Sequence, residues 1–157
     1  MKTLLTTSIA LFLLLFATEI RAQFSLGPGL AFGTDVDEIG IQVRAINSFA
    51  DQWRGSADVI YYLDGLKDFS IWEINLNAHY VFADANKFNA YALAGFNVLL
   101  FSASFLGESS TSTEAGLNLG TGGQYFISDK VSGLVELKYT ISDLNQLVIG
   151  LGLQFQL

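Results

Sequence analysis

The chain has 157 residues, which is enough for one domain and too few for two. It is 51% hydrophobic and only 15% charged, whereas soluble domains carry about 25% charged residues, so less of its surface than usual is suited to water. The absence of cysteine excludes a disulfide framework and a lipid-anchoring cysteine, and the net charge of −7 argues against binding nucleic acid. Nothing in the composition indicates a cofactor or a structural metal site.

The first 22 residues have the three parts of a secretory signal peptide. Lys2 supplies a positive start, residues 9–17 form an apolar run, and a short polar stretch leads to Ala22. The sequence therefore predicts a signal peptide at 1–22, cleaved after Ala22, and a single mature domain at 23–157. The alternative is a membrane anchor, but the apolar run is shorter than the ~20 residues that a spanning helix needs.

The rest of the chain has a hydrophobic period of two, which is the pattern of β-strands. Eight segments show this pattern, and each is long enough to cross a bilayer at a tilt, which takes ~9–11 residues. They lie at residues 24–33, 39–49, 54–63, 69–82, 88–101, 113–126, 131–141 and 147–157. The last segment alternates most regularly, and the first contains Pro28, which suits a strand with imperfect edge pairing.

The fifth segment contains apolar residues in two opposite phases. Tyr91 and Leu93 favour one phase, whereas Phe96 and Val98 favour the other. A bulge near Gly95 would reconcile them, because one extra residue exchanges the two faces of a strand. We therefore predict a β-bulge at that position.

The links between these segments are short and polar, and the longest, residues 102–112, contains a run of Ser and Thr. Short links between successive strands give an up-and-down meander, and eight strands can close into a barrel without exposed edges. The sequence therefore predicts an all-β, eight-stranded antiparallel up-and-down barrel. The 102–112 link is predicted to be a loop, and it is the best candidate for contacts with other molecules.

Alternation by itself does not say which face of the barrel points outward. A lipocalin-like barrel closes its apolar face around a ligand, whereas a membrane barrel turns that face to lipid. Volume favours the membrane barrel, because the interior of an eight-stranded barrel is only wide enough for side chains to fill it. The other face is small and polar, and aromatic residues near the strand ends fit the girdles of a membrane barrel.

Charged residues on the polar face would be shielded from lipid inside such a barrel, where buried charges must pair or become neutral. We predict a network of ion pairs and amides that fills the lumen in place of an open channel. Its predicted members are Arg44, Arg54, Asp58, Glu73, His79, Glu114, Glu136 and Lys138.

His79 is the only histidine, and a catalytic role would require a nucleophile and a base within hydrogen-bond reach. Glu73 lies on the same face but about 20 Å along the strand, and no serine is obviously close to His79. The sequence therefore favours a polar lumen residue, and the protein is not predicted to be an enzyme. The acidic turn with Asp35, Asp37 and Glu38 lacks the ligand spacing of a calcium loop, so no metal site is predicted.

The mature chain resembles the small eight-stranded outer-membrane barrels of the OmpA/OmpX type, which consist of an outer membrane protein β-barrel domain. The resemblance lies in the signal peptide, in the segment Tyr-Ala-Leu-Ala-Gly-Phe at 91–96 and in the last strand. It implies a monomeric transmembrane barrel in the outer membrane of a Gram-negative bacterium. The implied partners are outer-membrane lipid, the barrel insertion machinery and periplasmic chaperones. An even number of strands then places both termini on the periplasmic side.

In this family the insertion machinery recognises the final strand, which usually ends on an aromatic residue. Here Phe155 lies two residues before the terminal Leu157, and the resemblance implies that these two residues form the insertion signal. A structural or surface-interaction role is the first functional hypothesis. The alternatives are a narrow pore, a soluble secreted barrel that binds an apolar ligand, and a lipid-modifying enzyme.

Overall fold

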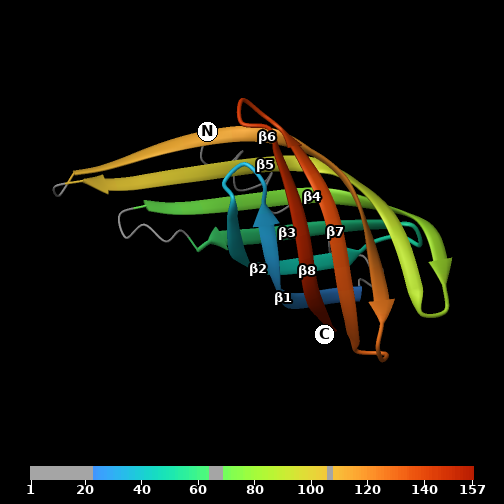
Figure 1. The fold of residues 1–157 in the computed structure, drawn as a ribbon. Coiled ribbons are helices and arrows are strands. Elements are labelled where there is room, and N and C mark those ends of the chain that lie inside the picture. Colours follow the sequence, from blue (N-terminus) through green and yellow to red (C-terminus); the bar gives the residue numbers. More distant parts are fainter. Residues whose placement is uncertain (1–22, 64–68, 106–107) are drawn as a thin grey trace, which may run out of the picture.

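The computed structural model describes residues 23–63, 69–105 and 108–157, and the predicted signal peptide at 1–22 lies outside these ranges. The described residues form eight strands (Figure 1): β1 (Gln23–Gly33), β2 (Glu38–Ser48), β3 (Trp53–Tyr62), β4 (Phe69–Ala85), β5 (Phe88–Phe105), β6 (Glu108–Phe126), β7 (Val131–Ile141) and β8 (Gln146–Gln156). Each strand pairs antiparallel with the next, and β1 also pairs with β8, so the sheet closes into a barrel. The predicted fold class is confirmed. Within the described ranges, no helix is long and apolar enough to cross a membrane.

The outward-facing side chains are apolar on every strand. One such residue from each strand has between 39% and 66% of its surface exposed: Leu30, Val43, Val59, Leu76, Phe96, Leu119, Leu137 and Leu151. Two cross-strand aromatic pairs lie at opposite ends of the β3–β4 ladder, with ring centroids 5.1 Å apart for Trp53 and Tyr80 and 4.8 Å apart for Tyr61 and Trp72. The apolar surface therefore surrounds the barrel, and aromatic pairs lie at both ends of it on the β3–β4 ladder.

The interior has three layers. Charged and amide side chains occupy the middle, and an apolar cluster lies on each side of them. The cluster toward the β1–β2 turn contains Ala31, Ile60, Tyr62, Leu99 and Val148. The cluster toward the chain termini contains Ile46, Val81, Tyr91, Leu93 and Leu134. The interior thus holds large apolar side chains as well as the small and polar ones that the sequence predicts.

The β5–β6 hairpin is longer than the rest of the barrel (Figure 1). β5 and β6 have 18 and 19 residues, whereas β7 and β8 have 11 each. β6 pairs with β5 back to Glu108 but with β7 only from Leu117 onward. The prediction of a loop at 102–112 is therefore wrong, because the strands continue through most of it. Its Ser and Thr residues are polar on both faces, so they lack the alternation that marks a strand, although Thr favours extended backbone.

The predicted bulge near Gly95 is also wrong. The register between β4 and β5 runs without interruption from Val81–Tyr91 to Phe69–Ala103, and the irregularity lies on β4 between Val81 and Ala83. Tyr91 and Leu93 point into the barrel and are almost fully buried, whereas Phe96 is 66% exposed. Apolar residues therefore occupy both faces of one regular strand, and no change of phase is needed.

The seam between β1 and β8 joins the two ends of the chain and is less regular than the other ladders. Its pairs include Leu26–Phe155 and Gly29–Gly152, but no pair forms at Gly27 and Pro28. Proline has no backbone N–H and cannot donate to a ladder. The seam is therefore interrupted where Pro28 lies.

Candidate functional site

The barrel interior contains most of the residues that the sequence analysis singled out. Arg44, Arg54, Asp58, Glu73, His79, Glu136 and Lys138 are all buried. Glu114 is half-buried, and it lies on the part of β6 that extends beyond β7. The structure therefore brings seven of the eight residues into the interior and leaves Glu114 outside the network that they form.

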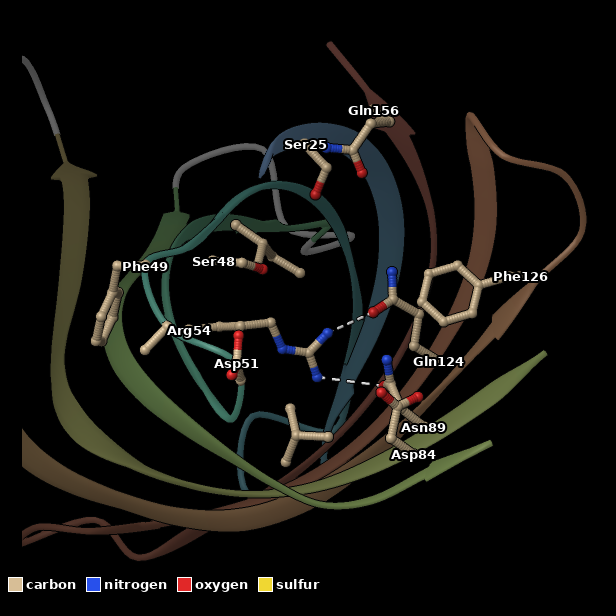
Figure 2. A pocket seen from close by; sticks show the side chains of 13 residues that line it. Ser25, Ser48, Phe49, Asp51, Arg54, Asp84, Asn89, Gln124, Phe126 and Gln156 are labelled. Atoms are coloured by element: carbon tan, nitrogen blue, oxygen red, sulfur yellow. Dashed lines mark hydrogen bonds between the residues drawn. The ribbon is translucent and has the colours of Figure 1, made fainter. Parts of the chain in front are cut away.

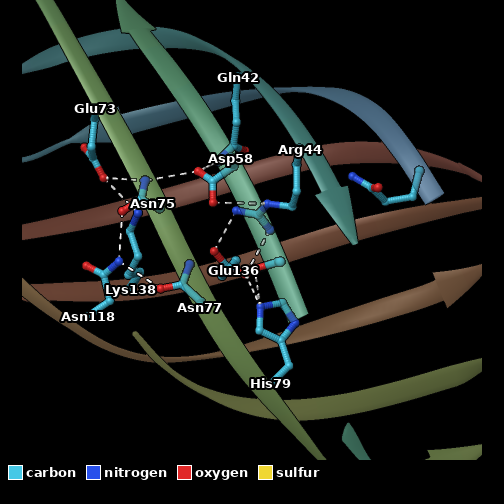
Figure 3. Close-up of polar contacts among 12 residues, drawn as sticks. Gln42, Arg44, Asp58, Glu73, Asn75, Asn77, His79, Asn118, Glu136 and Lys138 are labelled. Atoms are coloured by element: carbon cyan, nitrogen blue, oxygen red, sulfur yellow. Dashed lines mark hydrogen bonds and ion pairs between the residues drawn. The ribbon is translucent and has the colours of Figure 1, made fainter. Parts of the chain in front are cut away.

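An ion pair between Arg44 and Glu136 crosses the middle of the barrel (Figure 3). Arg44 on β2 donates from Nη1 to Oε2 of Glu136 on β7 at 2.9 Å and from Nη2 to Oε1 at 2.7 Å. Asp58 on β3 lies on the other side of the guanidinium, with Oδ2 3.8 Å from Nε. This bidentate geometry is the strong form of an arginine–carboxylate contact, and it links strands that are not neighbours in the sheet.

A second ion pair joins Lys138 on β7 to Glu73 on β4. Lys138 Nζ donates to Oε1 of Glu73 at 2.8 Å. The same carboxylate accepts hydrogen bonds from the Tyr62 hydroxyl at 2.6 Å, from Asn75 at 2.9 Å and from Gln146 at 3.1 Å. Glu73 thus has a donor for most of its lone pairs, which is what a buried carboxylate needs.

Asparagines connect the two ion pairs, and no single one of them was predicted as a site residue. Asn75 Oδ1 accepts from Asn97 at 3.0 Å and from Asn118 at 2.8 Å, and Asn118 also donates to Asn77 at 2.9 Å. Asn75 donates in turn to Asp58 at 3.1 Å. The signal in the sequence was Asn75 and Asn77 at alternate positions of one strand, on the face opposite to the apolar residues.

His79 lies closer to a serine than the sequence indicated. Its Nε2 is 2.9 Å from Oγ of Ser56 and 4.0 Å from Oε2 of Glu136, so the prediction that no serine is nearby is wrong. The arrangement is not that of a catalytic triad, because serine and carboxylate face the same ring nitrogen, whereas a triad places them on opposite nitrogens. Ser56 is buried, and the imidazole stacks on Tyr91 with ring centroids 4.3 Å apart. His79 is therefore packed into the network.

Arg54 is held differently from Arg44. It donates from Nη1 to the side-chain oxygen of Gln124 at 2.6 Å and from Nη2 to that of Asn89 at 3.3 Å, and its guanidinium lies 4.9 Å from the Tyr91 ring centroid. It points into a cavity of about 490 Å³ at the end of the barrel where the chain termini lie (Figure 2). Arg54 thus forms the floor of an open cavity. Arg44 lies deeper in the barrel, in the closed middle layer of the interior.

No protein-family model and no curated protein sequence matches this chain. Solved structures do match it. The N-terminal β-barrel domain of OprF from Pseudomonas aeruginosa has a TM-score of 0.73 at 14% identity, over 87% of this chain and 99% of that chain. Ail, the attachment invasion locus protein of Yersinia pestis, has 0.65 at 17% identity, over 87% and 97%. Neisserial surface protein A has 0.65 at 17% identity, over 87% and 96%. This chain therefore has the fold of the small eight-stranded outer-membrane β-barrels.

Proposed function

We propose that the protein is an integral outer-membrane barrel with a filled interior, and that its β5–β6 hairpin makes contacts outside the membrane. The observation that carries this proposal is the outward apolar surface, which surrounds the barrel while charged and amide side chains are buried inside. In a bilayer, lipid would cover this surface, and the closed sheet would satisfy the backbone hydrogen bonds of the spanning strands.

The same observation disfavours a soluble barrel that carries an apolar ligand. That function needs apolar side chains around an internal cavity and polar ones in water. Here the cavity at the terminal end is lined mostly by polar side chains, and Arg54, Asn89 and Gln124 are among them. Leu76 and Phe96 lie on the outer surface instead, with more than 60% of their surface exposed.

The cross-barrel network favours a filled lumen over a narrow pore. The Arg44–Glu136 pair spans the interior, and apolar clusters containing Ile60 and Leu93 lie on its two sides. An ion entering from the cavity at the terminal end would have to pass the Arg44–Glu136 pair and then the apolar cluster around Ile60. We expect planar lipid bilayers with the purified barrel to show no steady conductance, and a large steady conductance would overturn this part of the proposal.

The free edge of β6 supports a surface-interaction role. Residues 110–116 pair with β5 on one side, and no described strand pairs with their other side. An unpaired edge presents backbone donors and acceptors that can take up an extended segment of another protein. One of the matching structures, Ail, is named as an attachment protein. We propose that the projecting β5–β6 hairpin of this chain likewise serves for contact with other molecules.

The last strand supports recognition by the barrel insertion machinery, with periplasmic chaperones acting before it. Phe155 faces outward on β8 and is 42% exposed, and Leu157 is 79% exposed. The Leu157 N–H donates to the carbonyl of Phe24 at 3.0 Å, so the C-terminal residue still belongs to the β1–β8 seam. With an even strand number, both termini and this signal would lie on the periplasmic side.

The membrane assignment is tested by fractionation and by gel mobility with and without boiling. The full chain should be processed and recovered from the outer-membrane fraction, and the unboiled protein should migrate as a compact, detergent-resistant species. Boiling should convert it to the mobility of an unfolded chain. Mature protein that stays monomeric and folded in buffer without detergent would contradict the proposal.

A further inference from the structure

Among the described residues, Arg54 is a buried cation that has no carboxylate in ion-pair contact. It is 7% exposed, and in the described part of the chain no aspartate or glutamate forms an ion pair with it. The other two buried cations, Arg44 and Lys138, each have a carboxylate within 3 Å. Burying a charge without a counter-ion is costly, so an anion supplied from outside would stabilise this position.

The guanidinium also has free donors. Of its five N–H groups, one is donated to Gln124 and one to Asn89, and Nε is buried without a partner among the described residues. One further N–H remains on each of Nη1 and Nη2, and guanidinium N–H groups paired in this way bind a carboxylate through two parallel hydrogen bonds. Figure 2 shows this guanidinium reaching toward Gln124 and Asn89, among the side chains that line the cavity.

The cavity has the size and the access that a small ligand needs. Its volume of about 490 Å³ falls within the range of ordinary small-molecule sites. Arg54, Asn89 and Gln124 form its buried floor, whereas Asp51 and Asp84 line it as exposed residues. A ligand would therefore enter past two carboxylates and meet a guanidinium at the bottom.

This charge arrangement selects among anions. The two aspartates would repel a phosphate dianion on its way in, whereas they would attract an ammonium group that stays near the mouth. Apolar side chains of Phe49, Val81 and Phe126 also line the cavity and can cover a short aliphatic segment. The best-fitting ligand has a carboxylate at one end and an ammonium at the other, a few bonds away.

We propose that the cavity around Arg54 binds a small zwitterion of the amino-acid or dipeptide class, with its carboxylate on Arg54 and its ammonium toward Asp51 and Asp84. The site opens at the end of the barrel where the chain termini lie, so it is separate from the β5–β6 hairpin. The proposed ligand site is therefore independent of any binding role of that hairpin.

The sequence provides a selective readout, because residues 23–157 contain two arginines, Arg44 and Arg54. The mature barrel, refolded in detergent and shown to be heat-modifiable, gives two arginine Nε–H signals in an NMR spectrum. Titration with glycylglycine should shift the Arg54 signal saturably and leave the Arg44 signal in place. N-acetylglycine, which lacks the ammonium, and glycinamide, which lacks the carboxylate, should each bind at least tenfold more weakly. Inorganic phosphate should compete poorly.

Two variants and one control test the geometry. Arg54→Gln should weaken glycylglycine binding at least tenfold, as measured by calorimetry and by the amide signals of Asn89 and Gln124. Lys87→Gln removes a positive charge from the β4–β5 turn, outside the cavity lining, and should leave binding unchanged. Asp84→Asn keeps Arg54 and should weaken glycylglycine but not N-acetylglycine.

Four results would overturn the proposal. These are the absence of a saturable shift in a heat-modifiable sample, an equal shift at Arg44, unchanged binding in Arg54→Gln, and equal binding of glycylglycine and N-acetylglycine. Because every sample is first checked for heat-modifiable folding, a failure of the barrel assignment would be seen separately. Should Arg54→Gln fail to fold, the Asp84→Asn variant and the two modified ligands still decide the outcome.

Discussion

Arg44 and Glu136 face each other across the centre of the barrel through two hydrogen bonds of 2.9 and 2.7 Å, although β2 and β7 are not adjacent in the sheet. Asp58 and Tyr91 also approach this pair, Asp58 at 3.8 Å from Arg44 and Tyr91 by donating its hydroxyl to Glu136 at 2.8 Å. Most contacts in a barrel run around the sheet from one strand to the next. This pair instead connects two strands that are separated by β1 and β8 around the barrel.

Removing one partner of this pair should destabilise the barrel strongly. Arg44→Ala leaves Glu136 buried without its cation, and breaking a buried pair in this way costs about 3–5 kcal/mol. The free energy of unfolding in urea, followed by gel mobility, measures the effect. The double variant Arg44→Met, Glu136→Leu should recover part of the loss, since it removes both charges of the pair and leaves Asp58 with its donors Gln42 and Asn75. A single variant as stable as the wild type would contradict the importance of the pair.

Gly122 should tolerate no side chain, because Tyr91 lies directly over it. A Cβ at Gly122 would lie 2.4 Å from the Tyr91 ring, and displacing that ring would disturb its stacking on His79. We expect Gly122→Ala to lower the free energy of unfolding by about 1–3 kcal/mol.

Gly150 provides the matched control on the same inner face. A Cβ there would meet nothing closer than 3.7 Å. Gly150→Ala should therefore stabilise the barrel slightly, by about 0.4–1 kcal/mol, because alanine restricts the unfolded chain. Equal destabilisation by both substitutions would show that overcrowding at Tyr91 is not the cause.

Shortening the β5–β6 hairpin should leave the barrel stable. Ala103 and Ser110 are directly opposite in the ladder, so residues 104–109 can be replaced by Asn-Gly, which forms a two-residue turn. No described part of β7 or β8 pairs with the removed segment, so heat-modifiability and the urea midpoint should stay close to wild type. Any adhesion of cells that express the protein should decrease. Loss of folding would mean that the hairpin supports the barrel itself.

The C-terminal residue should affect the rate of assembly more than final stability. Leu157→Phe restores a terminal aromatic, and we expect faster appearance of the folded, heat-modifiable form after a pulse of synthesis. Phe155→Ala should slow it. Leu153→Ala changes another outward residue of β8 and controls for the loss of apolar surface. An equal delay in both alanine variants would argue against a specific signal.

Alternation in the sequence was sufficient to predict the strand number and the two faces, because in a meander each strand pairs with its neighbours in the chain. The prediction was wrong where a segment has no apolar face, or has apolar residues on both faces. The Ser/Thr residues near 110 have no apolar face to mark a strand. Tyr91 and Leu93 are apolar but point inward, so the apolar residues of β5 change from one face to the other although the strand is regular.

The contacts inside the barrel depend on information that alternation does not contain. Ser56 reaches His79 because the β3–β4 register places Arg54 opposite His79 and Ser56 two residues further along. Arg44 and Glu136 are 92 residues apart, and their meeting depends on how the closed sheet is staggered. The sequence therefore predicts which residues face inward, but it does not predict which of them form hydrogen bonds or ion pairs with one another.

The seam at Pro28 has a consequence for how the barrel is completed. Seven of the eight ladders join consecutive strands and can form as hairpins, whereas the ladder between β1 and β8 needs the first and last strands to meet. This last ladder has no pair at Gly27 and Pro28, so fewer hydrogen bonds hold it than its length allows. Backbone amides along this line should exchange with deuterium before those of the other ladders, because the cylinder opens most easily where the chain's two ends were joined.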